Sequence, residues 1–110
     1  MRGNGDSCAE VTIRVPNRLG LHARPAAEFV KLSSRFNSSV TVEKDGLEVN
    51  GKSIMGVMML AAEFGSSLRI RAEGVDAPDA VTALSRLVES GFGEREIDYG
   101  SDMDGKGARS

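Results

Sequence analysis

The feature that most constrains the fold is a set of four short segments in which apolar and polar residues alternate. They span residues 10–15, 40–43, 47–50 and 68–72. Alternation with a period of two is typical of a β-strand that buries one face. The positions on the other face are all polar: Thr12, Arg14, Thr41, Glu43, Glu48, Asn50, Arg69 and Arg71. Because parallel sheets are usually covered on both sides, this polar face favours an antiparallel or mixed sheet. On the return strand, Leu47 and Val49 are expected to point inward.

Helical spacing of apolar residues marks three further segments. The first spans residues 24–36, the second spans 53–64 with a stop at Gly65, and the third begins after Asp76 and stops at Gly91. We expect Asp76 to cap the third helix and Asp45-Gly46 to form a tight hairpin turn. The order is then β-α-β-β-α-β-α, and all three helices must cover the single apolar face of the sheet. This predicts an α/β (α+β) fold, a two-layer open-faced sandwich.

The length of 110 residues suits one small domain. We place this domain at residues 10–91, between a flexible N-terminal lead, 1–9, and a flexible C-terminal tail, 92–110. Both ends are polar and contain glycines, and the large apolar residues of the tail are isolated. Such segments bury too little surface to offset the entropy of ordering them.

Composition excludes several classes of protein. A net charge of −2 argues against non-specific binding of nucleic acid. A single cysteine, Cys8, gives no disulfide framework, and a single histidine makes a zinc site improbable, so we expect neither a metal nor a cofactor. The start of the chain has no apolar signal region, and no apolar run reaches the length that spans a membrane. These observations favour a cytoplasmic protein.

The one histidine, His22, precedes the first predicted helix in the sequence GLHARPAA, residues 20–27. Pro25 fits a first helical turn, where its missing N–H costs nothing. A helix start offers free N–H groups and the positive end of the helix dipole, which favour an anion. Arg24 adds a guanidinium, and the amides of Arg24, Ala26 and Ala27 are candidate further donors. A nucleophilic imidazole in an anion site indicates a phosphoryl acceptor. The alternative is an ordinary surface histidine near a helix terminus.

The second predicted helix carries more apolar residues than the sheet can cover. Val57, Leu60, Ala61 and Phe64 form a stripe that suffices to face the sheet. Ile54 and Met58 flank this stripe, and Met55 and Met59 lie further round the helix. Exposed methionines form an adaptable binding surface. Burial of the helix on several sides is the alternative. Ser53 is placed to be the N-cap of this helix.

Two motifs resemble the HPr family, the histidine-containing phosphocarriers of the bacterial phosphoenolpyruvate:sugar phosphotransferase system. Residues 20–27 resemble the active-site signature of the family, and residues 51–58, GKSIMGVM, resemble its regulatory serine motif. Residues 67–74 resemble its last strand, and the resemblance covers about residues 10–90. It implies a four-stranded antiparallel sheet with three helices on one face.

The resemblance also implies a function and its residues. His22 would accept phosphate on Nδ1 from enzyme I and pass it to an enzyme IIA domain, with Arg24 stabilising the phosphoryl group. Ser53 would be a phosphorylation site for an HPr kinase in bacteria that have one. The docking face for partners would include Ala23, Ala27, Ser34, Ile54, Met55 and Met58. The chain would then be a monomeric phosphoryl carrier rather than an enzyme.

Two other function classes stay open. One is a regulatory HPr relative, either in nitrogen-related phosphotransfer or as a serine-phosphorylated corepressor. Intact His22 argues against a regulator that lacks the histidine, and the intact KSIMG motif at 52–56 argues mildly against the nitrogen branch. The other class is a binding module that shares only the architecture, for which His22→Ala would have no biochemical effect.

Overall fold

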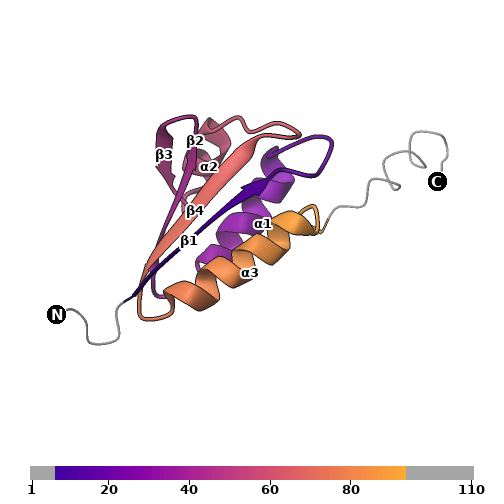
Figure 1. Cartoon of the computed structure of the whole chain (residues 1–110). Coiled ribbons are helices and arrows are strands. Elements are labelled where there is room, and N and C mark those ends of the chain that lie inside the picture. Colours follow the sequence, from indigo (N-terminus) through magenta and orange to yellow (C-terminus); the bar gives the residue numbers. More distant parts are fainter. Residues whose placement is uncertain (1–6, 94–110) are drawn as a thin grey trace.

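The computed structural model describes residues 7–93 and confirms the predicted architecture. The elements are β1 (Ser7–Arg14), α1 (Ala23–Ser33), β2 (Ser39–Lys44), β3 (Leu47–Asn50), α2 (Ile54–Met59), β4 (Ser67–Gly74) and α3 (Ala77–Glu89). The four strands form one sheet in the order β1-β4-β2-β3, and each neighbouring pair is antiparallel. The helices lie together on one side of the sheet (Figure 1).

The core lies between the sheet and the helices, as the alternation predicts. Leu68, Ile70 and Ala72 of the central strand β4 are fully buried, and Val40 and Val42 lie beside them on β2. Phe29 of α1 and Leu84 of α3 cover these strand residues from the helical layer. The core is aliphatic apart from Phe29 and Phe92.

The predicted hairpin between β2 and β3 is present. Asp45 and Gly46 both have positive φ, 52° and 87°, the geometry of a type I′ turn. The inward prediction is wrong for Leu47, which is 45% exposed, because it pairs with Lys44 directly beside the turn. Val49, one pair further into the sheet, packs against the core as predicted.

The second helix is shorter than predicted. α2 ends at Met59, and Ala61 adopts a φ of 49°, so the chain leaves the helix before Phe64. This turn carries Leu60 and Ala62 into the core, whereas Ala61 and Phe64 are exposed. The predicted stripe is therefore wrong at Ala61 and Phe64, because tertiary contacts of Ala62 outweigh the local helical pattern.

Both domain boundaries lie further out than predicted. β1 begins at Ser7 rather than at residue 10, because Ser7, Cys8 and Ala9 pair with Gly74, Glu73 and Ala72. Phe92, which we assigned to the tail, is 2% exposed and its N–H donates to the carbonyl of Leu87. Residues 1–6 of the predicted lead and 94–110 of the predicted tail lie outside the described residues.

Asp76 occupies the N-cap position of α3, but its side chain does not cap the helix. Its carboxylate instead accepts hydrogen bonds from the N–H groups of Asn37 and Ser38, both at 2.9 Å, and from Ser38 Oγ at 2.5 Å. The hydrogen bond from the Ser38 hydroxyl and those from the two amides lower the pKa of the Asp76 carboxyl. Asp76 therefore ties the start of α3 to the turn before β2.

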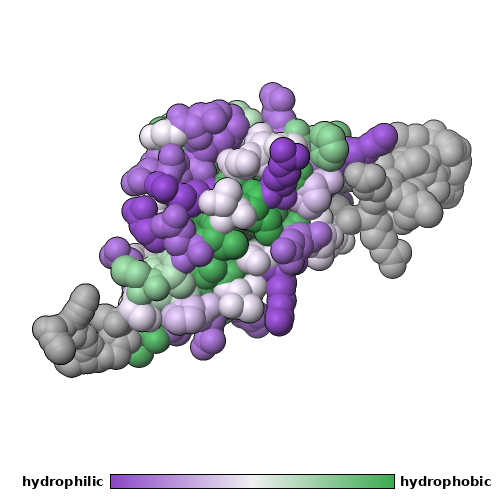
Figure 2. Space-filling view, viewed as in Figure 1, coloured by the Kyte–Doolittle hydropathy of each residue, from purple (hydrophilic) through white to green (hydrophobic). Residues whose placement is uncertain are grey.

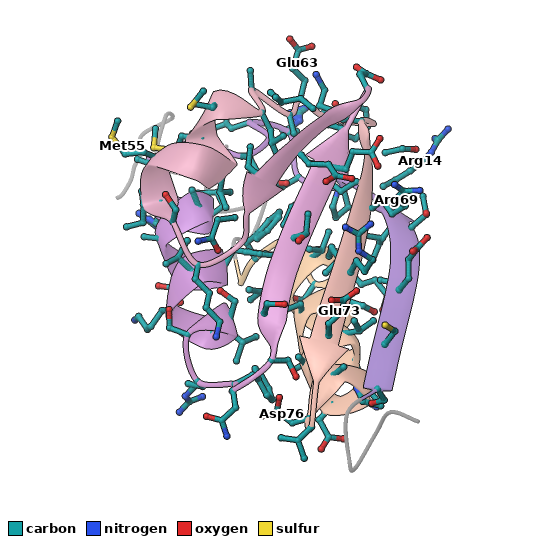
Figure 3. All side chains as sticks on the ribbon, turned by 90° about the vertical axis from the view of Figure 1, so that its left-hand side faces the viewer. Arg14, Met55, Glu63, Arg69, Glu73 and Asp76 are labelled. Carbon is teal, nitrogen blue, oxygen red and sulfur yellow. The ribbon has the colours of Figure 1, made fainter. Side chains whose placement is uncertain are left out.

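The open face of the sheet carries charged residues that pair across strands. Arg69 on β4 forms ion pairs with Glu10 of β1, Glu43 of β2 and Glu48 of β3, and its neighbour Arg71 also reaches Glu48. Arg69 stands out from the strand face in Figure 3. Figure 2 shows hydrophilic side chains gathered over the side of the molecule where β2 and β3 lie. Within residues 7–93, no helix is long and apolar enough to cross a membrane.

Candidate phosphoryl-transfer site

His22 is the N-cap residue of α1. Its backbone is extended, with φ −79° and ψ −171°, and its carbonyl accepts from Ala26 N–H at 3.0 Å to close the first helical turn. The residue is half-buried, and no hydrogen bond from its side chain caps the helix. The imidazole thus stands at the positive end of an 11-residue helix.

A short loop before His22 is fixed at both ends and in its middle. Val15 exchanges backbone hydrogen bonds with the 60–66 loop, accepting from Gly65 and donating to Ser66, both at 2.8 Å. The buried side chain of Asn17 donates to the carbonyl of Gly20 at 2.8 Å, and Leu21 N–H donates to the carbonyl of Ala62 at 2.9 Å. These bonds hold the backbone that leads into His22, while the bond from Ala26 holds His22 to α1.

Gly20 is required in this loop for two reasons. Its φ is +68°, and a Cβ there would lie 2.4 Å from the carbonyl oxygen of Ala62. The absence of a side chain therefore lets the loop approach the 60–66 segment closely enough for the hydrogen bond from Leu21 to form.

The donors around His22 differ in part from those expected. Ala26 N–H is occupied by the carbonyl of His22, and Ala27 N–H lies within the regular hydrogen bonding of α1. Pro25 has no N–H, so the helix geometry leaves the first two amides, those of Ala23 and Arg24, without an acceptor inside the helix. The expectation for Ala26 and Ala27 is thus wrong, whereas Arg24 keeps both its amide and its exposed guanidinium for an anion.

The predicted docking residues lie on two neighbouring helices. Ala23 is exposed and Ala27 half-buried on the first turns of α1, whereas Ser34 is the C-cap at its other end, about 16 Å from Ala23 along the axis. On α2, the exposed fractions are 44% for Ile54, 73% for Met55, 41% for Met58 and 64% for Met59. The predicted exposure of Met55 and Met59 is confirmed, and Met55 points away from the body of the molecule in Figure 3. The alternative, burial of α2 on several sides, is excluded, because Val57 is the one buried residue of this helix.

Ser53 is the N-cap of α2, as predicted. Its Oγ accepts from Gly56 N–H at 3.0 Å, and its carbonyl accepts from Val57 N–H at 2.9 Å. The side chain is half-buried. α2 starts near the end of α1, because Ser33 Oγ donates to the carbonyl of Gly51 at 2.6 Å. It ends near the start of α1, where Ala62 meets Leu21.

Lys52 has a structural contact that the sequence analysis missed. Its Nζ donates to the carbonyl of Phe36 at 2.7 Å, just beyond the C-terminus of α1. A lysine near the end of a helix is a known signal for such a contact, but the separation of Lys52 and Phe36 in sequence hides it. The contact of Asn17 with Gly20 is local in sequence, but it was missed because the Pro16-Asn17 pair indicates only a turn.

The family model for the HPr component of the phosphotransferase system, described as its phosphorylation site, matches residues 9–90. The chain belongs to the HPr family. Phosphocarrier protein HPr of Xylella fastidiosa (strain Temecula1) is 49% identical over 85 residues, 77% of this chain and 96% of that protein. Phosphocarrier protein HPr of Treponema pallidum is 49% identical over 83 residues, 76% of this chain and 94% of that protein.

Solved structures of HPr proteins share the fold. HPr-C-His from Thermoanaerobacter tengcongensis is 52% identical, with a TM-score of 0.76 over 79% of this chain and 98% of that one. The HPr-like protein Crh of Bacillus subtilis is also similar in sequence, at 46% identity over 70% of this chain and 91% of that protein. HPr is a phosphocarrier family, and a phosphohistidine is the form in which its members carry phosphate.

Proposed function

We propose that this chain is a cytoplasmic, monomeric phosphocarrier that accepts a phosphoryl group on His22 from phospho-enzyme I and donates it to enzyme IIA domains. The observation that carries the proposal is the position of His22. The one imidazole of the chain stands at the N-terminus of α1, beside the exposed Arg24 and the first two amides of the helix. Membership of the HPr family supports the same chemistry.

In the proposed step, the lone pair of neutral His22 Nδ1 attacks the phosphorus of the donor. A nitrogen–phosphorus bond forms on His22 as the bond from phosphorus to the donor enzyme breaks, and the donor takes back the electron pair. The reverse step delivers the phosphoryl group to the acceptor. Neutral imidazole suits both directions, because it is nucleophilic near neutral pH and is a good leaving group once phosphorylated.

The site should stabilise the phosphoryl group only modestly. Arg24 offers a planar fork for two oxygens, and the amides of Ala23 and Arg24 offer further donors. A stronger cradle would hold the phosphoryl group against transfer to the acceptor. We therefore expect the partner enzymes to supply most of the stabilisation of the transition state.

Incubation with phosphoenolpyruvate and enzyme I tests this function. The proposal predicts an acid-labile, alkali-stable phosphoryl adduct that is absent in His22→Ala and is discharged by an enzyme IIA domain. A binding module predicts no adduct with an enzyme I that phosphorylates another HPr in the same assay. That result would remove the carrier function.

We further propose that phosphorylation of Ser53 regulates the same surface. A phosphoryl group there would place a charge of roughly −2 at the start of α2, next to Ile54 and Met55. The fold would change little, because the N-terminus of a helix tolerates an anion, but the docking surface would become anionic. The similarity to Crh keeps a regulatory role open as the second candidate function. Assay of Ser53 with an HPr kinase, with Ser53→Ala as control, distinguishes this regulation from sugar transport alone.

A further inference from the structure

A second exposed apolar cluster lies at the His22 end of the molecule, outside the docking residues considered so far. Leu19 is 57% exposed and Phe64 is 65% exposed. Together with Pro16 and Arg18, these two residues line one shallow hollow between the 15–22 and 60–66 loops. Large apolar side chains that share an exposed hollow mark a place where another molecule binds.

This hollow is joined to the phosphoryl-transfer site by backbone hydrogen bonds. Leu21, the residue before His22, donates to Ala62 at 2.9 Å, and Val15 pairs with Gly65 and Ser66. The loop that carries Leu19 and the loop that carries Phe64 therefore form one unit with the backbone that positions His22. Leu19 lies three residues from His22, which limits their Cα separation to about 11 Å.

A protein that exchanges a phosphoryl group with His22 must bring its reacting atom into contact with the imidazole. An interface of ordinary size covers about 800 Å² on each partner, a patch of about 16 Å radius. Such a patch centred on His22 reaches Leu19, one of the residues that line the hollow. The area that a phosphodonor must cover therefore extends beyond α1 and the methionines of α2.

We propose that the Leu19–Phe64 hollow is a second anchor for enzyme I, in addition to the methionine surface of α2. The inference rests on the proposed function. Arg18 is the one charged residue among those that line the hollow. The matching surface of enzyme I therefore presents an apolar side chain that enters the hollow beside a carboxylate that faces Arg18. A second contact near His22, separate from the methionines of α2, fixes the angle at which the donor approaches the imidazole.

Steady-state phosphorylation by phospho-enzyme I tests the anchor in the full chain. Phe64→Ser and Leu19→Ser should each raise the KM for this chain roughly tenfold, as expected for loss of an apolar anchor at an interface. The kcat should stay close to that of the parent, because neither residue contacts the phosphoryl group. Phe64→Leu should restore most of the affinity. Arg18→Gln should raise KM and make it less dependent on ionic strength.

Val75→Ser is the matched control. Val75 is 61% exposed and directly follows β4. Its neighbour Asp76 and Glu63 lie at opposite ends of the molecule in Figure 3. The KM of enzyme I for the Val75→Ser variant should equal its KM for the parent chain. Unchanged KM values for Phe64→Ser and Leu19→Ser in a chain that still accepts phosphate would overturn the anchor and leave the carrier function intact. A parent chain that accepts no phosphate would overturn both. Concentration-dependent dimerisation that Phe64→Ser abolishes would assign the hollow to a second copy instead.

Discussion

At the scale of single residues, Gly20 controls where the reactive histidine stands. Gly20→Ala adds a Cβ that would meet the carbonyl of Ala62 and forces an L side chain into positive φ. We expect a loss of at least about 2 kcal/mol in the free energy of unfolding, together with slower phosphoryl acceptance as the loop shifts. Chemical denaturation measures the free energy of unfolding. The rate of phosphorylation by enzyme I measures phosphoryl acceptance.

Gly65→Ala is the control for the backbone conformation alone. Gly65 also has positive φ, +85°, but a Cβ added there would meet no atom within 4 Å beyond its chain neighbours. We expect a loss of about 1 kcal/mol. Equal losses for the two variants would show that the close approach of Gly20 to Ala62 contributes nothing.

Ser53 joins a structural role to the proposed regulatory one. Ser53→Ala removes the acceptor of Gly56 N–H and should cost about 1 kcal/mol in urea unfolding. Ser53→Asp keeps a capping oxygen and should retain the stability of the parent, but its charge should slow phosphoryl acceptance from enzyme I. An Asp variant that accepts phosphate as fast as the parent would contradict the proposed regulation.

Asp76 makes stability depend on pH. Hydrogen bonds, above all the one from the Ser38 hydroxyl, lower the pKa of this carboxyl in the folded state below its ordinary value of 3.8. The stabilisation by Asp76 is therefore present at a pH above the pKa of this carboxyl in the unfolded state. It is lost as the pH falls through the pKa of the carboxyl in the folded state. In Asp76→Asn we expect lower stability at neutral pH and a shallower decline below about pH 4 than in the parent. Thermal unfolding across pH measures this.

At the scale of elements, the contact between α1 and the start of α2 depends on two side chains. The fully buried Ser33 donates to the carbonyl of Gly51, and Lys52 Nζ donates to the carbonyl of Phe36. Ser33→Ala leaves the Gly51 carbonyl without this donor and should cost about 1–3 kcal/mol. In Ser33→Ala, amide hydrogen exchange should become faster than in the parent, and this increase should be larger in α2 than in β4. Ser34→Ala, at the exposed neighbouring position, should change neither quantity.

The strands follow from the sequence more closely than α2 does. Leu68, Ile70 and Ala72 alternate with charged residues, and this pattern alone fixes which face of β4 is buried. The end of α2 depends instead on Ala62, whose carbonyl binds Leu21 forty-one residues earlier. A local pattern that includes Phe64 cannot reveal that contact. The same limit applies to Asp76, whose partners Asn37 and Ser38 are distant in sequence.

At the scale of the whole molecule, the sheet separates two surfaces with different roles. The face of the sheet that no helix covers carries the ion pairs around Arg69. The helical layer carries the exposed apolar surfaces. β1, α3 and the loop before α1 end at the same side of the molecule (Figure 1). The motif of residues 20–27 predicts the position of His22 at a helix start. The hollow cannot be predicted from the sequence, because Leu19 and Phe64 line it together only through the hydrogen bonds between their two loops.

NMR of the phosphorylated protein shows whether His22 carries the phosphoryl group. Because the chain has one histidine, any phosphoimidazole signal comes from His22. After incubation of ¹⁵N-labelled protein with phosphoenolpyruvate and enzyme I, the account predicts one phosphoimidazole signal, with phosphorus coupled to Nδ1. A protein that shows no such signal under conditions where enzyme I charges another HPr, or that carries the phosphorus on a different side chain, would contradict the account.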